Sequence, residues 1–326
     1  MGAQRGGGHK KSPPANPVII PLYWGADLGF FRDSLLSVGG QFLMIILHDP
    51  LCAEYGSSMR PEQPARVLRS AAHLQAAHPD WTWQRPAAAD EAALLTAHTP
   101  ALLRRIQHAP DIDDDTPIFP GISDHARRAV GAAVAAADRA LAGQPAFALM
   151  RPPGHHCTRA QAMGFCYLNQ IAIAALRAAA AGRRVAVWDF DAHHGNGTED
   201  ILRDRPNVLF ASVHQFPGYP GTGTSSFANC LNFPVAPRTP RTAHLDALAR
   251  SWEAVLAFQP DLVLVSAGFD AYAGDPITEM TLEGDDFATL GRWLREAGRP
   301  AAAVLEGGYS PDLPQLIDTF LTAWKN

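Results

Sequence analysis

Cysteine is scarce in this chain, and no two cysteines have the spacing of a redox or metal-binding motif. The four cysteines are scattered along 326 residues without a CxxC or ladder pattern: Cys52, Cys157, Cys166 and Cys230. Such usage argues against a disulfide framework and favours reduced thiols. We therefore predict a cytoplasmic protein.

Long apolar runs and an excess of positive charge are also missing. No segment reaches the roughly 18 consecutive apolar residues that span a bilayer, so no membrane partner is expected. The net charge is −5, from 27 basic and 32 acidic residues, and gives no reason to expect nucleic-acid binding. A composition with 47% hydrophobic and 18% charged residues is typical of a globular protein with a substantial core.

The first forty or so residues show no clear periodicity of apolar residues. Residues 1–17 are rich in Gly, Lys and Pro, and no signal-peptide apolar region with a cleavage site follows them. We expect residues 1–43 to be a poorly ordered appendage outside the core, and an over-extended start upstream of Met44 is the alternative. Residues 44–326 contain no repeat or shift in composition and are expected to form one domain.

From Met44 onward, short apolar runs alternate with helical patterns, as in a parallel sheet with crossover helices. The expected strands are 43–48, 146–150, 184–190, 207–213, 261–267 and 301–305. The expected helices are 61–78, 123–142, 167–181, 242–258, 285–297 and 312–324. The predicted fold class is therefore α/β.

Polar motifs follow five of these strands. They are RPPGHH at 151–156, DFDAHHGNGT at 189–198, SVH at 212–214, GFD at 268–270 and EGGY at 306–309. In open parallel sheets, ligands bind outside the carboxyl ends of the strands. One composite site is therefore expected at that edge of the sheet.

Two of these motifs contain candidate metal ligands. Asp189, Asp191 and His193 stand at alternate positions, so they can converge on one face of the strand end. Carboxylates at the tip of an apolar strand are costly unless they are hydrogen-bonded or bind a cation. Asp191, His193 and Asp270 have the ligand types of a catalytic zinc site with an open position. Magnesium or a structural Asp–His pair are alternatives, but the imidazole favours zinc, iron or cobalt.

Three other side chains at this edge suit proton transfer and hydrogen bonding. His155 and His156 follow a rigid Pro-Pro-Gly turn beside the expected metal, which favours a role in proton transfer. Tyr309 follows two glycines, so its loop can bring the phenol over the metal. The isolated histidines are expected to be surface residues or satisfied core residues: His73, His78, His98 and His108.

These motifs resemble those of the histone deacetylase and acetylpolyamine amidohydrolase family, whose members share an arginase-like fold. The other matching segments are GFCYLN (164–169), YPGTG (219–223) and SAGFDAYAGDP (266–276), with a weaker match at HDP (48–50) and RPEQPAR (60–66). The resemblance covers residues 44–326, which would be the catalytic domain. It implies a central, mainly parallel sheet of about eight strands flanked by helices, with the active site at the C-terminal ends of the strands.

The resemblance implies a zinc-dependent hydrolase that removes acetyl or other acyl groups from the ε-amine of acetyl-lysine or from related N-acylated amines. The three predicted ligands would hold one Zn²⁺, or Fe²⁺ in vivo. His156 would act as the general base for a metal-activated water, and His155 would stay largely electrostatic. Tyr309 would donate a hydrogen bond to the oxyanion.

Asp189 and Asn196 are expected to give the two histidines different pKa values. The family's pattern pairs Asp189 with His155. The partner of His156 is the neutral Asn196 where some members have an aspartate, which resembles the class II branch. A carboxylate raises the pKa of a histidine and a neutral amide does so far less, which leaves His156 the better base.

Two further sites are implied by the resemblance. The family holds a monovalent cation, typically K⁺, near the strand end, and the matching residues are Asp189, Asp191, His193, Ser212 and Val213. The narrow substrate tunnel would be formed by Gly164, Phe165, Tyr219, Ile277 and Gly307. Two facing aromatic rings suit an extended alkyl chain such as that of acetyl-lysine.

Two features bear on the substrate. Relatives specialised for acetylated polyamines can carry a glutamate just after the GDP motif, where Ile277 stands here, although Glu279 lies two residues on. The acidic run 111–115 is either a solvated loop or the source of an aspartate that holds the substrate backbone or a cation in the family. The leading prediction is a deacetylase of acetyl-lysine or small acylated amines. The alternatives are an acetylpolyamine amidohydrolase and a catalytically weak acyl-binding protein, and a homo-oligomer is possible for each.

Overall fold

The computed structural model describes residues 1–2, 43–108 and 112–325. The strands in these residues are β1 (Ile45–Leu47), β2 (Thr82–Gln84), β3 (Ala146–Ala148), β4 (Val185–Asp189), β5 (Val208–Gln215), β6 (Cys230–Val235), β7 (Leu262–Ala267) and β8 (Ala301–Leu305). They form one sheet in the order β2-β1-β3-β8-β7-β4-β5-β6, and every neighbouring pair is parallel. The predicted α/β class with a parallel sheet is confirmed.

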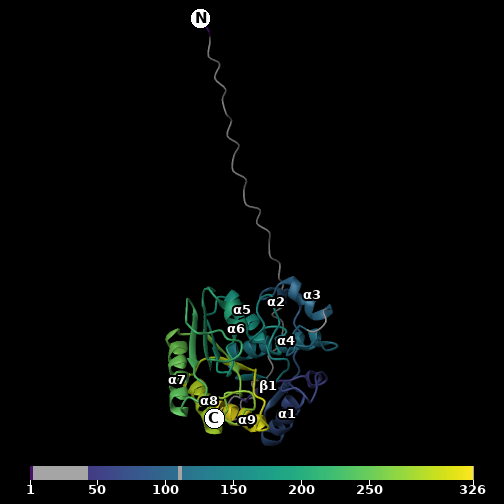
Figure 1. Cartoon of the computed structure of the whole chain (residues 1–326), viewed down its shortest axis with the longest axis vertical. Coiled ribbons are helices and arrows are strands. Elements are labelled where there is room, and N and C mark those ends of the chain that lie inside the picture. The colour runs from purple at the N-terminus through teal and green to yellow at the C-terminus, as the bar shows by residue number, and fades with distance from the viewer. Residues whose placement is uncertain (3–42, 109–111, 326) are drawn as a thin grey trace. The chain divides into compact units, whose positions relative to one another are not determined.

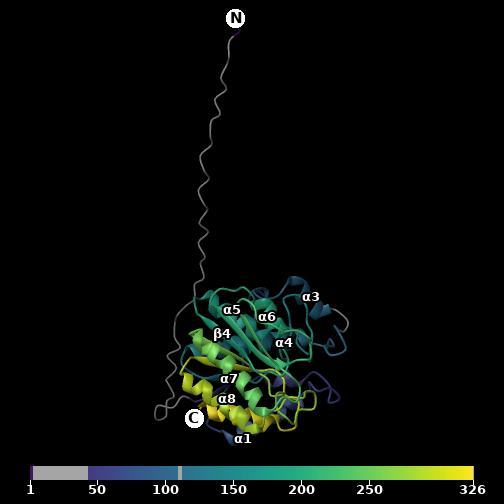
Figure 2. The same cartoon turned by 60° about the vertical axis from the view of Figure 1, so that its left-hand side comes forward.

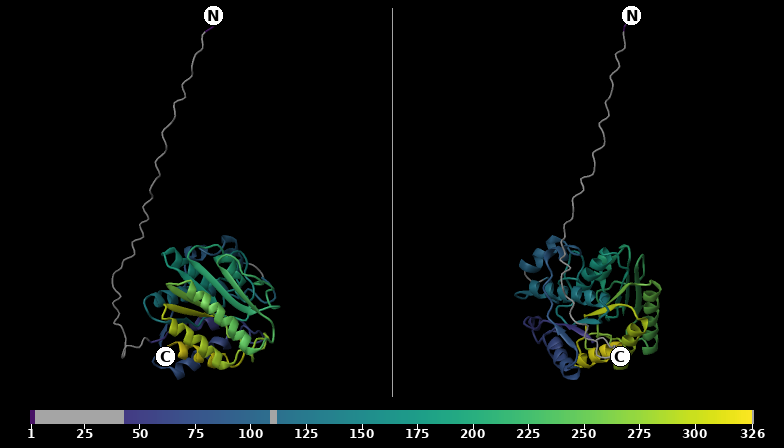
Figure 3. Two further views of the ribbon diagram at one scale, coloured as in Figure 1. Left: turned by 90° about the vertical axis from the view of Figure 1, so that its left-hand side faces the viewer. Right: turned by 180° about the vertical axis from the view of Figure 1, so that it is seen from behind.

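Helices cover both faces of this sheet (Figure 1). They are the 3₁₀ helix η1 (Pro50–Ala53) and the α-helices α1 (Ala65–Ala77), α2 (Glu91–Leu95), α3 (Pro100–His108), α4 (Ile122–Leu141), α5 (Gln170–Ala180), α6 (Asn196–Leu202), α7 (Arg241–Ala257), α8 (Gly284–Ala297) and α9 (Leu313–Lys325). Helices α4, α5 and α6 pack on one face, and α7, α8, α9 and α1 lie on the other (Figures 2 and 3).

The central strands are buried along their whole length, because a parallel sheet has helices on both sides. Their sequences are accordingly continuous apolar runs, such as Val185-Ala186-Val187-Trp188 in β4. Just beyond β4, Phe190 contacts Phe269, Phe287 of α8 and Phe320 of α9. This aromatic cluster anchors the strand end that carries the predicted metal ligands.

All six predicted strands are present, and the prediction missed the two edge strands. Strand β2 has only three residues, all half-buried, so it lacks the apolar run of an interior strand. Strand β6 contains Pro234, which cannot donate a ladder hydrogen bond and is tolerated because β6 pairs with β5 alone. The six predicted helices are present too, but α1 begins at Ala65 rather than at residue 61, where prolines interrupt the pattern.

The five polar motifs converge as predicted. Strands β3, β8, β7, β4 and β5 are consecutive neighbours in the sheet. Four of the motifs stand at or after the end of their strand, whereas SVH (212–214) lies inside β5, which continues to Gln215 beyond the predicted end at residue 213. The last of them in the chain, β8, lies between β3 and β7 in the middle of the sheet. The five motifs therefore share one edge, and segments more than 150 residues apart in sequence meet there.

Three further expectations concern the cysteines, membrane-spanning helices and the N-terminal appendage. The four cysteines are buried and free, as expected for reduced thiols. Among the described residues, no helix combines the length and the apolar character that crossing a membrane requires. The expected appendage falls almost wholly outside the described residues, and the boundary at residue 43 stays a prediction.

Candidate active site

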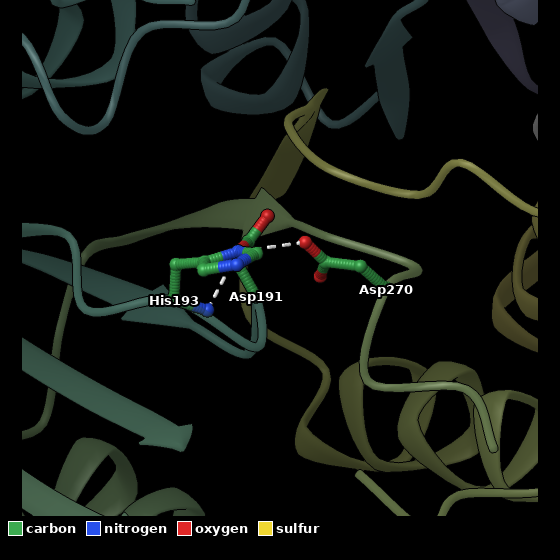
Figure 4. Close-up of side chains that lie close together, drawn as sticks. All are labelled: Asp191, His193 and Asp270. Atoms are coloured by element: carbon green, nitrogen blue, oxygen red, sulfur yellow. Dashed lines mark hydrogen bonds and ion pairs between the residues drawn. The ribbon is translucent and has the colours of Figure 1, made fainter. Parts of the chain in front are cut away.

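Asp191, His193 and Asp270 form a compact cluster of ligand atoms at the edge of the sheet. Asp191 and His193 follow β4, Asp270 follows the neighbouring β7, and the three side chains point toward one another (Figure 4). Their ligand atoms all lie within 4.8 Å of one another. His193 Nδ1 is 3.1 Å from Asp191 Oδ1 and 2.9 Å from Asp270 Oδ2.

The chemistry of this cluster fits a divalent cation. Both carboxylates are completely buried; Asp270 Oδ1 accepts a hydrogen bond from Ala192 N–H, whereas Oδ2 has only the ion-pair contact with His193 Nδ1 given above. Burial raises the pKa of Asp270, and the adjacent Asp191 carboxylate raises it further. A cation bound between the two carboxylates would offset this repulsion. Two carboxylates and one imidazole suit Zn²⁺, Fe²⁺ or Co²⁺.

Backbone N–H groups orient Asp191. Its Oδ1 accepts a hydrogen bond from His193 N–H at 2.8 Å, and its Oδ2 accepts one from Gly307 N–H at 2.7 Å. A Cβ at residue 307 would collide with Asp191 Oδ2 and Asp270 Oδ2, so this close approach requires glycine. Gly307, predicted with the substrate-binding residues, thus lies against the carboxylates of the cluster.

His155 is held in the charged form. Its Nδ1 lies 3.1 Å from Asp189 Oδ2, and its Nε2 lies 3.8 Å from Asp191 Oδ1. Burial alone would lower the pKa of His155, but Asp191 and Asp189 outweigh burial and raise it to about 10. The two carboxylates therefore favour the imidazolium form of this ring.

His156 has the opposite preference. Its Nδ1–H donates to Asn196 Oδ1 at 2.8 Å, which leaves Nε2 free to accept a proton. Burial lowers the pKa of His156 well below its ordinary value, and the neighbouring charges of His155 and His193 lower it further. The two histidine rings lie 4.0 Å apart, so a charged and a neutral imidazole stand side by side.

A cavity of about 270 Å³ opens at this cluster. Its lining residues are Pro61, Asp115, His156, Gly164, Phe165, His193, Tyr219, Ile277 and Tyr309. Four of the five residues predicted to bind substrate are therefore on its wall, together with the predicted base, one metal ligand and the predicted oxyanion donor. Apolar and aromatic walls with a few polar groups are typical of small-molecule sites.

The geometry of the cavity wall depends on Gly164. This glycine has a φ of 56°, and a Cβ there would collide with the His156 ring. Tyr219 contacts the same ring edge to face, with centroids 5.0 Å apart, and Phe165 contacts Tyr309 at 5.9 Å. The two predicted tunnel rings thus each pack against a predicted catalytic residue.

Tyr309 is fixed by its backbone and its ring. Its N–H donates to Asp275 Oδ2 at 2.7 Å, and the Arg66 guanidinium lies 4.7 Å from the centroid of its ring. Burial raises the pKa of Tyr309 well above its ordinary value. The phenol is therefore protonated at neutral pH and can donate a hydrogen bond into the cavity.

The residues of the predicted K⁺ site lie together where β4 ends beside the interior of β5. Asp189 is opposite Ser212 in the register of the two strands, and Val213 follows. Asp189 Oδ1 accepts a hydrogen bond from Asp191 N–H at 3.1 Å, and Ser212 Oγ lies 2.9 Å from His214 Nδ1. Binding of K⁺ at this place stays a prediction.

Sequence reasoning gave no role to Asp275 and Glu306, although both lie within the motifs. Asp275 accepts hydrogen bonds from Ile277 N–H at 3.1 Å and from Tyr309 N–H, so it joins the cavity rim to the tyrosine loop. Glu306 Oε2 accepts from Gly154 N–H at 2.7 Å. For Glu306, the signal available in the sequence was an acidic residue directly after the apolar strand β8.

Asp115 is the residue of the acidic run that reaches the cavity. Its N–H donates to Asp113 Oδ1 at 3.0 Å, and the carbonyl of the exposed Asp114 accepts a hydrogen bond from Arg60. Asp111, which also belongs to the run, lies outside the described residues. The sequence alone could not distinguish these aspartates, because only the path of the loop selects one of them.

Residues 60–323 match the family described as the histone deacetylase domain. The chain belongs to this family. An uncharacterised protein of Synechocystis sp. is 37% identical over 290 residues, which are 81% of this chain and 92% of that protein. A histone deacetylase-like amidohydrolase of Pseudomonas aeruginosa is 41% identical over 248 residues, which are 69% of this chain and 65% of the relative.

The fold agrees with a solved member of the same group. The crystal structure of an acetylpolyamine aminohydrolase from Burkholderia pseudomallei superimposes with a TM-score of 0.79 and 26% identity, covering 86% of this chain and 98% of that one. The predicted family and the deacetylase-like fold are confirmed. The predicted enzyme class, a hydrolytic deacetylase, is confirmed at the level of the family.

Proposed function

We propose that this chain is a metal-dependent hydrolase that removes acetyl or other acyl groups from N-acylated amines. One observation carries the proposal: a single cavity is lined by His193 of the candidate metal site, His156 and Tyr309. A Lewis acid, a base and an oxyanion donor around one carbonyl are what amide hydrolysis requires.

Asp191, His193 and Asp270 would hold the metal, which we propose is Zn²⁺, with Fe²⁺ as the alternative in vivo. When bound, the ion supplies a Lewis acid that polarises the amide carbonyl and lowers the pKa of a water molecule. Two completely buried carboxylates, whose ligand atoms lie within 4.8 Å of each other and of the His193 imidazole, support a cation at this place.

The two histidines have different roles, and only His156 transfers a proton. His156 accepts the proton of the attacking water at Nε2, since its Nδ1–H is committed to Asn196. His155 keeps its charge beside Asp189 and acts electrostatically. When the C–N bond breaks, His156 returns the proton to the departing amine nitrogen, which leaves as a neutral amine.

Tyr309 stabilises the charge that develops on the carbonyl oxygen. Its phenol donates a hydrogen bond that strengthens as the oxygen becomes an oxyanion. The raised pKa of Tyr309 supports this role, because only the protonated phenol can donate.

The cavity favours an acyl-lysine side chain, in a protein or a peptide, over an acetylated polyamine. Phe165 and Tyr219 provide rings for an extended alkyl chain, and Ile277 offers no charge to a distal ammonium. Glu279 is ion-paired with Arg238 and is not among the lining residues. It is therefore poorly placed to bind a polyamine ammonium in the cavity.

An acetylpolyamine amidohydrolase is the second candidate, and Asp115 is the observation that favours it. Its carboxylate on the cavity wall could bind a distal ammonium as well as a peptide N–H. The third prediction, a catalytically weak acyl-binding protein, is disfavoured because Tyr309 and all three candidate metal ligands are present.

The same proposal covers the domain, its location and a second ion. We propose that residues 44–326 form the catalytic domain of a cytoplasmic protein that acts without nucleic acid or membrane. Asp189, Ser212 and their neighbours would hold K⁺ as a structural ion. A homo-oligomer is compatible with this chemistry.

The deciding experiment compares substrates on purified, metal-loaded protein. Acetyl-lysine peptides, acetylspermidine and acetylputrescine are assayed for release of acetate. We expect the peptides to give the highest kcat/KM, and Tyr309→Phe or a chelator to remove most of the activity. If metal-loaded protein hydrolyses none of these amides, the enzyme proposal is wrong. Faster hydrolysis of the acetylated polyamines would select the second candidate.

A further inference from the structure

Glu62 lies in the interior between two arginines. It is 6% exposed, and its two carboxylate oxygens accept hydrogen bonds from Arg151 Nε at 2.5 Å and Arg151 Nη2 at 2.6 Å. Arg66 Nη1 donates to Glu62 Oε1 at 3.4 Å. Two guanidinium groups therefore share one nearly buried carboxylate.

Arg151 is the first residue of the histidine loop, which we define as residues 151–156. Its side chain is completely buried, Nη1 donates to Cys52 O at 2.9 Å, and the guanidinium lies 4.2 Å from the centroid of the Tyr55 ring. Glu62 thereby fixes the start of the loop that carries His155 and His156.

Arg66 holds the tyrosine loop, which we define as residues 306–309. Its Nε donates to Gly308 O at 2.7 Å, and its Nη2 donates to Glu306 O. The guanidinium also covers the ring of Tyr309. Glu62 is therefore linked to Tyr309, the proposed oxyanion donor, through the side chain of Arg66.

The contacts close into a ring. The Glu306 carboxylate accepts hydrogen bonds from Gly154 N–H at 2.7 Å and His155 N–H at 3.2 Å. The histidine and tyrosine loops are thus joined directly by Glu306 and a second time through Arg151, Glu62 and Arg66. The spacing between the base and the oxyanion donor is held from two directions.

General stability does not explain such a ring. Apolar side chains of similar volume often replace a buried Arg–Glu–Arg group without loss of stability, because each buried charge carries a desolvation cost. A planar guanidinium fixes the direction of each hydrogen bond, which an apolar contact cannot do. The ring is therefore better explained by the orientation it imposes on the two loops.

We propose that Glu62 is a positioning residue, which acts through Arg66 and Arg151 to hold the Tyr309 phenol at its working distance from the histidine loop. This inference rests on the proposed function and goes beyond it, because Glu62 is not among the residues that line the cavity. A misplacement of a catalytic group by about 1 Å can cost about 100-fold in rate.

The first test needs no activity. Glu62→Gln keeps the size of the side chain and removes its charge. Asp286→Asn is the matched control, because Asp286 is a buried carboxylate that accepts two hydrogen bonds from Arg241 away from the cavity. Hydrogen exchange is expected to accelerate at residues 151–156 and 306–309 in Glu62→Gln and to stay at the wild-type rate there in Asp286→Asn. Unchanged exchange in both loops of a folded Glu62→Gln protein would overturn the proposal.

The second test is a double-mutant cycle with Tyr309→Phe. Glu62→Gln is expected to lower kcat by about 10- to 100-fold with less than about a threefold change in KM, and Asp286→Asn to keep the wild-type kcat. In the Tyr309→Phe background there is no hydroxyl to position, so the effect of Glu62→Gln should shrink below about threefold. An equal loss in both backgrounds would show that Glu62 does not act through Tyr309. If the wild-type protein hydrolyses no acylated amine, the proposed function fails, and the exchange experiment still decides the role of Glu62.

Discussion

Two adjacent imidazoles, His155 and His156, differ in the group that stands behind each ring. A buried carboxylate faces Nδ1 of the first, and a neutral amide faces Nδ1 of the second. The carboxylates of Asp191 and Asp189 favour the charged form of His155, whereas burial and the neighbouring charges keep His156 neutral, and its amide partner does little to oppose them. The resemblance to the family implied both partners, Asp189 for His155 and Asn196 for His156.

This difference predicts unequal effects of two substitutions. His156→Ala is expected to lower kcat by about 10²- to 10⁴-fold, and His155→Ala by less, because His156 lines the cavity and His155 does not. Steady-state kinetics on the best acylated substrate measure both, with melting temperatures as a check on folding. A larger loss from His155→Ala would exchange the two roles.

A second prediction at the residue scale concerns Gly307. Gly307→Ala places a methyl group against the carboxylates of Asp191 and Asp270, so we expect most of the bound metal to be lost on dialysis. Gly284→Ala is the control, since a Cβ there meets only Leu316 at 3.9 Å. Metal content measured by mass spectrometry decides the matter. Full metal occupancy in Gly307→Ala would mean that the loop can move away from the ligands.

At the scale of elements, the sequence predicted the interior strands, which are recognised by their apolar pattern. It did not predict the edge strands or the residues whose roles depend on distant contacts. Strands β3, β4, β5, β7 and β8 and the motifs after them were recognised, because interior parallel strands are continuous apolar runs. The edge strands β2 and β6 were missed because a short strand or one with a proline does not show this pattern. The roles of Glu62 and Glu306 were missed for a related reason, since their partners lie far away in sequence.

The acidic loop before α4 gives a prediction that separates neighbouring residues. Asp115→Asn is expected to raise KM by about tenfold and to leave kcat nearly unchanged, because its carboxylate lines the cavity and can hold a substrate N–H or ammonium. Asp114→Asn makes the same change of charge one residue away on an exposed side chain and should leave KM unaltered. Equal effects of the two variants would indicate only a general electrostatic attraction.

For the molecule as a whole, buried neutral histidines predict an acid-sensitive fold. His98 accepts a hydrogen bond from Asn169 N–H at Nε2, and burial lowers its pKa to about 4. Burial also lowers the pKa of His244 to about 4. Between about pH 4 and pH 6.5 the unfolded chain binds protons that the folded chain does not, so the free energy of unfolding falls as the pH falls.

Each of these histidines should cost about 2 kcal/mol of stability on going from pH 7.5 to pH 5. Urea unfolding of the wild-type protein and of His244→Leu at both pH values measures this loss. The variant should lose about 2 kcal/mol less than the wild type, and the exposed His108, replaced in the same way, is the control. An identical pH dependence in His244→Leu and the wild type would contradict the prediction.

The position of β8 has a consequence for the order of events during synthesis. This strand leaves the ribosome after every other strand, yet it lies between β3 and β7 and joins β2-β1-β3 to β7-β4-β5-β6. Until residues 301–305 emerge, the nascent chain can form only two half-sheets with open inner edges. The tyrosine loop follows β8 directly, so the protein cannot act on an acylated amine before the sheet has closed. We therefore expect the growing chain to lack the proposed activity, and its inner edges to need protection from wrong pairing until synthesis is nearly complete.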